Sequence, residues 1–121
     1  MRNARPILLV EDDTIDAMTV KRAFKELKVT NSLAHSLNGE EALEYLRQEG
    51  KEPPCVILLD LNMPKMNGVE FLKIAKGDLA LKKIPVVVLT TSNEERDIIE
   101  SFKLGVAGYI VKPVDYRKFV E

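Results

Sequence analysis

The sequence predicts an α/β fold in which helices cover both faces of an open, parallel sheet of five strands. Short apolar runs rich in valine, isoleucine and leucine alternate with longer segments whose apolar residues recur every three or four positions. Continuous apolar runs are typical of strands buried on both faces, and the alternation favours parallel strands linked by helices. The length of 121 residues suits one such domain, so we expect a single domain over residues 1–121.

Four of the five predicted strands are strongly apolar and one is weak. The strong runs lie at residues 7–10, 56–59, 86–89 and 109–111. The weak run, residues 32–37, mixes serines with the chain's only histidine, His35. Such a mixture is typical of an edge strand, and we interpret His35 as a half-exposed residue of that edge.

Helical periodicity fills the intervals between the strands. The periodic segments are residues 14–27, 40–48, 69–76 and 94–104, and a short last helix is expected from Asp115. Glycines lie near three of the expected helix ends, at Gly50, Gly77 and Gly105.

Small polar residues mark the expected helix starts. Thr14 and Asn93 have the side chains that N-caps require, and each precedes a periodic segment. Asn38 and Asn67 each stand before a glycine and therefore mark turns or helix starts.

Composition and charge exclude several classes of protein. The net charge is −1, from 18 basic and 19 acidic residues, so no basic surplus indicates a nucleic-acid or membrane-surface partner. No apolar stretch approaches the roughly 20 residues that a membrane-spanning helix needs, and the first apolar run is too short for a signal peptide. The single cysteine, Cys55, allows no intrachain disulfide and is expected to be at least half-buried. We therefore expect a cytoplasmic protein.

Polar and charged residues follow four of the predicted strands. They are Glu11, Asp12 and Asp13 after the first strand, Asp60 after the third, Thr90 and Thr91 after the fourth, and Lys112, followed by Pro113, after the fifth. In an open parallel sheet the carboxyl ends of the strands meet at one edge, where such proteins bind their ligands. We expect these side chains to meet there.

The residue types in this group restrict its chemistry. Carboxylates a few ångströms apart repel one another unless a cation lies among them. Oxygen ligands suit Mg²⁺, Mn²⁺ or Ca²⁺ rather than zinc, and a cluster partly open to water suits Mg²⁺ best. An ionised aspartate beside Mg²⁺ can attack a phosphorus atom, while a lysine and a threonine hold the phosphoryl oxygens. Each motif alone is more often structural, so the prediction depends on their conjunction.

At these residues the sequence resembles the response-regulator receiver family, typified by the bacterial chemotaxis response regulator. The resemblance covers essentially the whole chain. It is carried by Ile7-Leu8-Leu9-Val10-Glu11-Asp12-Asp13, by Leu59-Asp60-Leu61-Asn62-Met63-Pro64 with Asn67-Gly68, by Pro85 through Thr90-Thr91-Ser92 and by Gly108-Tyr109-Ile110-Val111-Lys112-Pro113. It implies a flavodoxin-like, doubly wound sheet with the strand order 2-1-3-4-5.

The resemblance implies a metal and phosphoryl site. Asp60 would be the phosphoacceptor, Asp12 would ligate Mg²⁺ directly, and Glu11 would do so through water. The backbone carbonyl of Asn62 would be a further ligand of the metal. Asp13, one residue past the family's acidic pair, would be an outer charge or a helix start.

The resemblance also implies a switch. Thr90 would carry the hydroxyl that moves toward the phosphoryl group, and Lys112 would pair with that group. The Lys112–Pro113 peptide would be cis, which costs little before proline. Tyr109 matches the aromatic residue whose rotamer reports activation.

The implied partner is a sensor histidine kinase that presents a phosphohistidine. The Leu-Thr-Thr-Ser and Lys-Pro-Val-Asp stretches look similar to small regulators paired with phytochrome-type kinases. A downstream protein target or a phosphorelay partner would receive the signal, and a homodimer stays open. The family implies a phosphoacceptor with slow self-dephosphorylation at most rather than an enzyme. His35, on its weak strand, is not a phosphotransfer histidine in this interpretation.

Three other classes of protein compete with this interpretation. Phosphohydrolases with an aspartate nucleophile also use Mg²⁺, lysine and threonine, but carry the nucleophile on the first strand and a second aspartate two residues on, where this chain has Asn62. A degenerate receiver would bind partners without being phosphorylated. A nucleotide-binding domain is poorly supported, since the first turn is acidic and has no glycine-rich loop.

Overall fold

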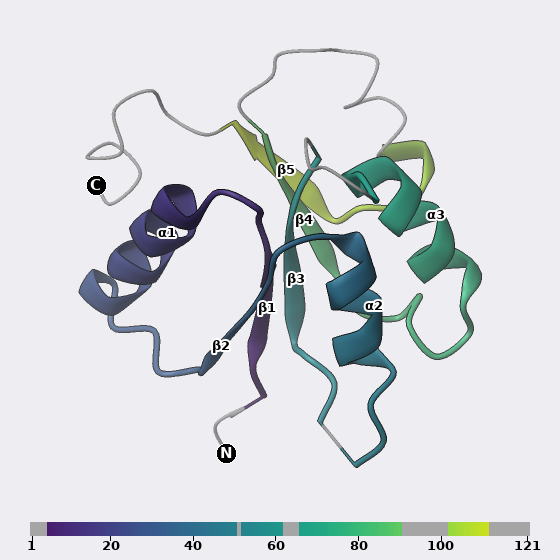
Figure 1. Ribbon diagram of the computed structural model, residues 1–121, viewed down its shortest axis with the longest axis horizontal. Helices are drawn as coiled ribbons and strands as arrows, with labels where there is room; N and C mark the ends of the chain where they lie inside the picture. Colours follow the sequence, from purple (N-terminus) through teal and green to yellow (C-terminus); the bar gives the residue numbers. More distant parts are fainter. Residues whose placement is uncertain (1–4, 51, 62–65, 91–101, 112–121) are drawn as a thin grey trace.

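The computed structural model describes residues 5–50, 52–61, 66–90 and 102–111, and its centre is a five-stranded parallel sheet (Figure 1). The strands are β1 (Ile7–Val10), β2 (Leu33–Ser36), β3 (Val56–Asp60), β4 (Val86–Thr90) and β5 (Gly108–Val111). Their order is β2-β1-β3-β4-β5, and every neighbouring pair is parallel. The predicted fold class and strand order are confirmed, and the strand bounds differ from those predicted by at most one residue at either end.

Helices cover both faces of the sheet. Helix α1 (Thr14–Glu26) lies on one face, and α2 (Gly39–Leu46) and α3 (Gly68–Gly77) lie on the other (Figure 1). Of the helix expected over residues 94–104, only the end is described, where Phe102 and Lys103 are helical. The expected cap at Asn93 and the last helix lie outside the described residues.

Each face of the sheet has its own apolar core, because successive side chains of a strand point to opposite faces. On the α1 face the buried members are Ile7, Leu9, Ala17, Val20, Leu58 and Leu89. On the opposite face the largest fully buried members are Leu8, Val10, Ile57, Leu59, Phe71, Leu72, Val86 and Val88. This two-sided burial explains why the strands are continuously apolar, and it anchors the strands whose ends carry the acidic residues.

Helix α1 is capped by Asp13, so the predicted cap at Thr14 is wrong by one residue. The Asp13 carboxylate accepts hydrogen bonds from the backbone N–H groups of Ile15 (2.8 Å) and Asp16 (3.1 Å), and Thr14 is the first helical residue. Both residue types make good caps, but only Asp13 has the extended backbone that an N-cap requires. Its negative charge also suits the positive end of the helix dipole.

The two asparagine helix starts are confirmed. The Asn38 side chain accepts a hydrogen bond from the Glu41 N–H at 3.0 Å and caps α2. Asn67 and Glu70 form a reciprocal capping box at the start of α3, with bonds of 2.9 and 3.0 Å.

Two glycines allow α2 and α3 to begin close to the segment that follows β3. The Gly68 N–H donates to the Leu61 carbonyl at 3.1 Å, and a Cβ at position 68 would lie only 2.7 Å from the carbonyl oxygen of Asp60. The Gly39 N–H donates to the Met66 carbonyl at 3.3 Å, and a Cβ there would lie 2.8 Å from the Met66 Cγ. A side chain at either glycine would push against the chain that leaves Asp60.

The assignment of the α1 cap can be tested with two neighbouring substitutions. Asp13→Ala removes the acceptor of two backbone N–H groups, and we expect it to lower the free energy of unfolding by about 1 kcal/mol. Thr14→Ala changes an exposed first-turn residue, and we expect an effect within about 0.5 kcal/mol. Urea denaturation of both variants measures the difference, and the reverse ranking would restore Thr14 as the cap.

The close approach of Gly68 to Asp60 makes a second prediction. We expect Gly68→Ala to lower the free energy of unfolding by about 1–3 kcal/mol, because the new methyl group must displace backbone atoms of Asp60 and Leu61. Gly77→Ala is the matched control in the same helix, since a Cβ there meets no atom within 4 Å, and it should cost nothing. Equal stability of the two variants in urea would contradict the tight contact.

Candidate metal and phosphoacceptor site

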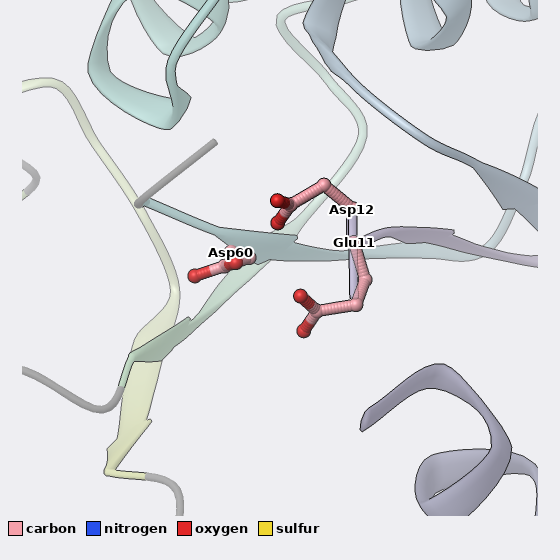
Figure 2. Close-up of side chains that lie close together, drawn as sticks. All are labelled: Glu11, Asp12 and Asp60. Atoms are coloured by element: carbon pink, nitrogen blue, oxygen red, sulfur yellow. The ribbon is translucent and has the colours of Figure 1, made fainter. Parts of the chain in front are cut away.

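Three carboxylates converge where β1 and β3 end. Glu11 and Asp12 follow β1 directly, and Asp60 is the last residue of β3. The two strands are neighbours, and their register pairs Val10 with Leu59, so Glu11 and Asp60 come next on adjacent strands. One oxygen atom from each carboxylate lies within 4.8 Å of the others (Figure 2). The predicted convergence of these acids at the sheet edge is therefore present in the structure.

The location of the cluster follows from the strand order. From β1 the chain continues to β2 on one side, whereas β3 lies on the other side, so the connections diverge between β1 and β3. Adjacent loops diverge at such a point and leave a crevice outside the carboxyl ends of the strands. The sequence of elements thus brings the acids to the part of the sheet edge where ligands bind in this class of fold.

Burial makes the cluster electrostatically costly. Glu11 is 0% exposed and Asp60 is 5% exposed, whereas Asp12 is only partly buried. Negative groups shielded from water repel one another more strongly than they would at the surface. A divalent cation offsets this repulsion, and an oxygen-only donor set fits a hard ion such as Mg²⁺ or Mn²⁺. Cluster geometry and donor chemistry together make this a candidate cation site, open on the side of Asp12.

Backbone N–H groups hold the acidic turn in place through two hydrogen bonds. The Glu11 N–H donates to the Ser36 carbonyl at 3.0 Å, which ties the turn to β2. The Glu11 carboxylate accepts a bond from the Asp13 N–H at 3.3 Å. Asp13 in turn caps α1, so its role as a helix start is confirmed. The two residues on either side of Asp12 are thus anchored to the sheet and to α1.

Sequence reasoning missed one contact of this turn. The His35 Nε2 atom lies 2.7 Å from the carbonyl oxygen of Glu11. His35 is partly buried on β2, as expected for an edge strand, but its ring was not expected to reach the acidic turn. Only the register of the predicted edge strand against β1 could have indicated this contact, and the sequence does not give that register.

The remaining predicted site residues are only partly described. Thr90 is the last residue of β4, one position beyond the Leu89 that pairs with Asp60, so its backbone lies at the same sheet edge. The side chain of Thr90 lies outside the described part of the structure. So do Asn62, Thr91, Lys112 and the Lys112–Pro113 peptide. Their predicted roles stay predictions.

Tyr109 lies on the edge strand β5, away from the carboxylates. Its side chain is 44% exposed, and its ring packs edge-to-face against Phe102, with ring centroids 5.7 Å apart and an interplanar angle of 83°. The ring is therefore at the surface in this structure, held by the helix that precedes β5.

In the described residues no helix is long and apolar enough to cross a membrane.

Comparison with known proteins agrees with the fold and the acidic cluster. Response regulator Rcp1 of Synechocystis sp. is 43% identical over 110 residues, which cover 88% of this chain and 75% of that protein. The crystal structure of the phosphorylated cyanobacterial phytochrome response regulator RcpA is 41% identical, with a TM-score of 0.89 and coverage of 98% of this chain and 87% of that one. The structure of the Mn²⁺-bound form of Rcp1 is 39% identical, with a TM-score of 0.88 and coverage of 96% and 86%.

The family assignment rests on nearly the full length of the chain. Residues 7–121 match the family described as the response regulator receiver domain. The matched region includes both acidic strand ends, all five strands and every helix described above. With the fold, the strand order and the carboxylate cluster in agreement, the chain belongs to the response regulator receiver domain family.

Proposed function

We propose that this chain accepts a phosphoryl group on Asp60 from a sensor histidine kinase, with Mg²⁺ held at the acidic cluster. The observation that carries the proposal is the buried Asp60 carboxylate with oxygen atoms of Glu11 and Asp12 within 4.8 Å. A bound cation would offset the charges of the neighbouring carboxylates, and an ionised aspartate beside it is a competent nucleophile. Two similar structures support it, one named as phosphorylated RcpA and the other as Mn²⁺-bound Rcp1.

The proposed metal ligands are oxygen atoms. The carboxylates of Asp12 and Asp60 would bind the ion directly, and that of Glu11 would bind it through water. The backbone carbonyl of Asn62 would be the remaining protein ligand. A bound Mg²⁺ would supply positive charge that offsets the three carboxylates and the incoming phosphoryl oxygens. The partly exposed Asp12 leaves a side of the cluster open to water and phosphate.

The proposed reaction is a phosphoryl transfer between two side chains. A carboxylate oxygen of Asp60 attacks the phosphorus of a phosphohistidine on the kinase, a P–O bond forms and the P–N bond breaks. The imidazole of the kinase leaves, and Asp60 becomes an acyl phosphate. Lys112 would donate a charge-assisted hydrogen bond to the phosphoryl oxygens, and the Thr90 hydroxyl would donate a neutral one.

The proposed output is a change of surface. Thr90 would move toward the phosphoryl group, and Tyr109, whose ring lies at the surface in this structure, would turn inward. Phosphorylation of Asp60 would thereby shift the equilibrium between two packing arrangements on the β4–β5 side of the sheet. By similarity to the phytochrome response regulators, we propose that the phosphoryl donor is a phytochrome-type kinase. The signal would pass to a protein target, to a phosphorelay partner or to a second copy of the chain. We also propose a cytoplasmic location.

Phosphorylation can be tested by intact-protein mass spectrometry with a small phosphodonor and Mg²⁺. We expect the wild-type chain to gain one phosphoryl group that hydroxylamine removes, as it does from acyl phosphates, and Asp60→Asn to gain none. Asp16→Asn is the matched control, since that aspartate lies in α1 outside the cluster and should leave uptake intact. Equal uptake by Asp60→Asn would refute the assignment, and repeated hydrolysis of a phosphomonoester would favour a phosphohydrolase.

Cation binding should be visible as stability. At about 100 times its Kd, Mg²⁺ is expected to raise the free energy of unfolding of the wild-type chain by about 2.7 kcal/mol. Asp12→Asn removes one ligand and one negative charge, so we expect it to be more stable than wild type without Mg²⁺ and to gain less from the ion. Urea denaturation at constant ionic strength measures both effects, with Asp16→Asn as control. A gain from Mg²⁺ that is the same in all three proteins would contradict binding at the cluster.

A further inference from the structure

The single histidine of the chain contacts the acidic turn from the edge of the sheet. His35 pairs with Leu9 in the β1–β2 register, and neighbouring residues in register share a face of the sheet. Its Nε2 atom lies 2.7 Å from the carbonyl oxygen of Glu11. Because a carbonyl oxygen only accepts hydrogen bonds, the Nε2 atom must carry the proton and donate it.

This bond lies where the ladder between the two strands ends. The Glu11 N–H still donates to the Ser36 carbonyl, as in a continued parallel ladder. Immediately beyond, the chain leaves β2 and begins α2 at Gly39, and the Leu37 N–H donates to the Glu41 side chain at 2.8 Å. At this point the imidazole of His35 donates to the Glu11 carbonyl from the side. Both backbone polar groups of Glu11 are therefore bonded to β2.

The bond acts on Asp12 through the geometry of the peptide. The Glu11 carbonyl and the Asp12 N–H belong to one planar unit, so a donor that fixes the carbonyl also fixes the direction in which the chain enters Asp12. Without a cation, repulsion among the three carboxylates favours moving Asp12 away, since it is the least buried of them. A restraint on the peptide between Glu11 and Asp12 opposes that movement.

We propose that His35 is a positioning residue for the cation site: its imidazole N–H holds the Glu11 carbonyl and keeps the Glu11–Asp12 peptide oriented for metal binding. The inference rests on the proposed function of the acidic cluster, and it adds a residue on β2 to a site otherwise built from β1 and β3. The ring holds the cluster ready before the cation arrives, so less of the binding free energy goes into ordering the turn.

Three variants separate positioning from a general contribution to stability. His35→Leu keeps an apolar body and removes the donor, whereas His35→Gln retains an N–H at nearly the same distance from the backbone. Leu33→Ala is the control: Leu33 lies on the same strand and the same face, packs against the α1-side core, and has no bond to Glu11. Mg²⁺ affinity by isothermal titration calorimetry and unfolding in urea are measured for each.

We expect His35→Leu to weaken Mg²⁺ binding roughly two- to tenfold, the range of one hydrogen bond in an equilibrium. His35→Gln should restore the affinity to within about twofold of wild type. Leu33→Ala should lower stability and leave Mg²⁺ affinity unchanged. Wild-type affinity in His35→Leu, no rescue by His35→Gln, or an equal loss in Leu33→Ala would each overturn the positioning role.

A spectroscopic measurement tests the same bond directly. Because the chain has one histidine, its imidazole ¹⁵N and ¹H signals need no assignment. We expect a protonated Nε2 whose signal shifts when Mg²⁺ is added to the wild-type chain and shifts much less in Asp12→Asn. An Nε2 atom that carries no proton while calorimetry shows Mg²⁺ binding would overturn the inference alone. A wild-type chain that binds no Mg²⁺ would overturn the proposed function together with it.

Discussion

The parallel pairing of β1 with β3 is the constraint on which the rest of the site depends. Each strand is buried on both faces, so its position is fixed by two apolar cores as well as by the ladder. That rigidity forces Glu11 and Asp60 to stay adjacent although their charges repel. The apolar cores thus hold the acids closer together than the same residues would lie in a loop. A bound cation would offset the electrostatic repulsion that results.

Around this constraint the neighbouring elements hold the two ends of the acidic turn. Asp13 is anchored to the first turn of α1, and Glu11 to β2 through its N–H and its carbonyl. Asp12, between them, is the least buried of the three clustered carboxylates, the other two being Glu11 and Asp60. The candidate site therefore has two well-anchored acids, Glu11 and Asp60, and one that is partly open to solvent, Asp12.

Much of the fold and part of the site could be predicted from the sequence. Two-sided burial produces uninterrupted valine, isoleucine and leucine runs, so the strands were visible, and the acids that follow them marked the sheet edge. The strand order came from family resemblance.

The cap of α1 was misplaced because Asp13 and Thr14 are both good capping residues and only the backbone conformation separates them. The contact of His35 depends on the register of β2 and on where that strand leaves the sheet, and spacing alone specifies neither. Asn62 and Lys112 lie outside the described residues, so their roles stay predictions.

The packing of Gly39 against Met66 has a consequence for how the molecule can respond as a whole. The first turn of α2 rests on the segment leaving Asp60, and the first turn of α3 rests on Asp60 itself. Helix α1, on the opposite face, starts at a residue bonded to Glu11. The starts of α1, α2 and α3 thus contact Glu11, the Met66 backbone, and the Asp60 and Leu61 backbone, respectively. A displacement of those acids would therefore alter contacts at the starts of helices on both faces of the sheet.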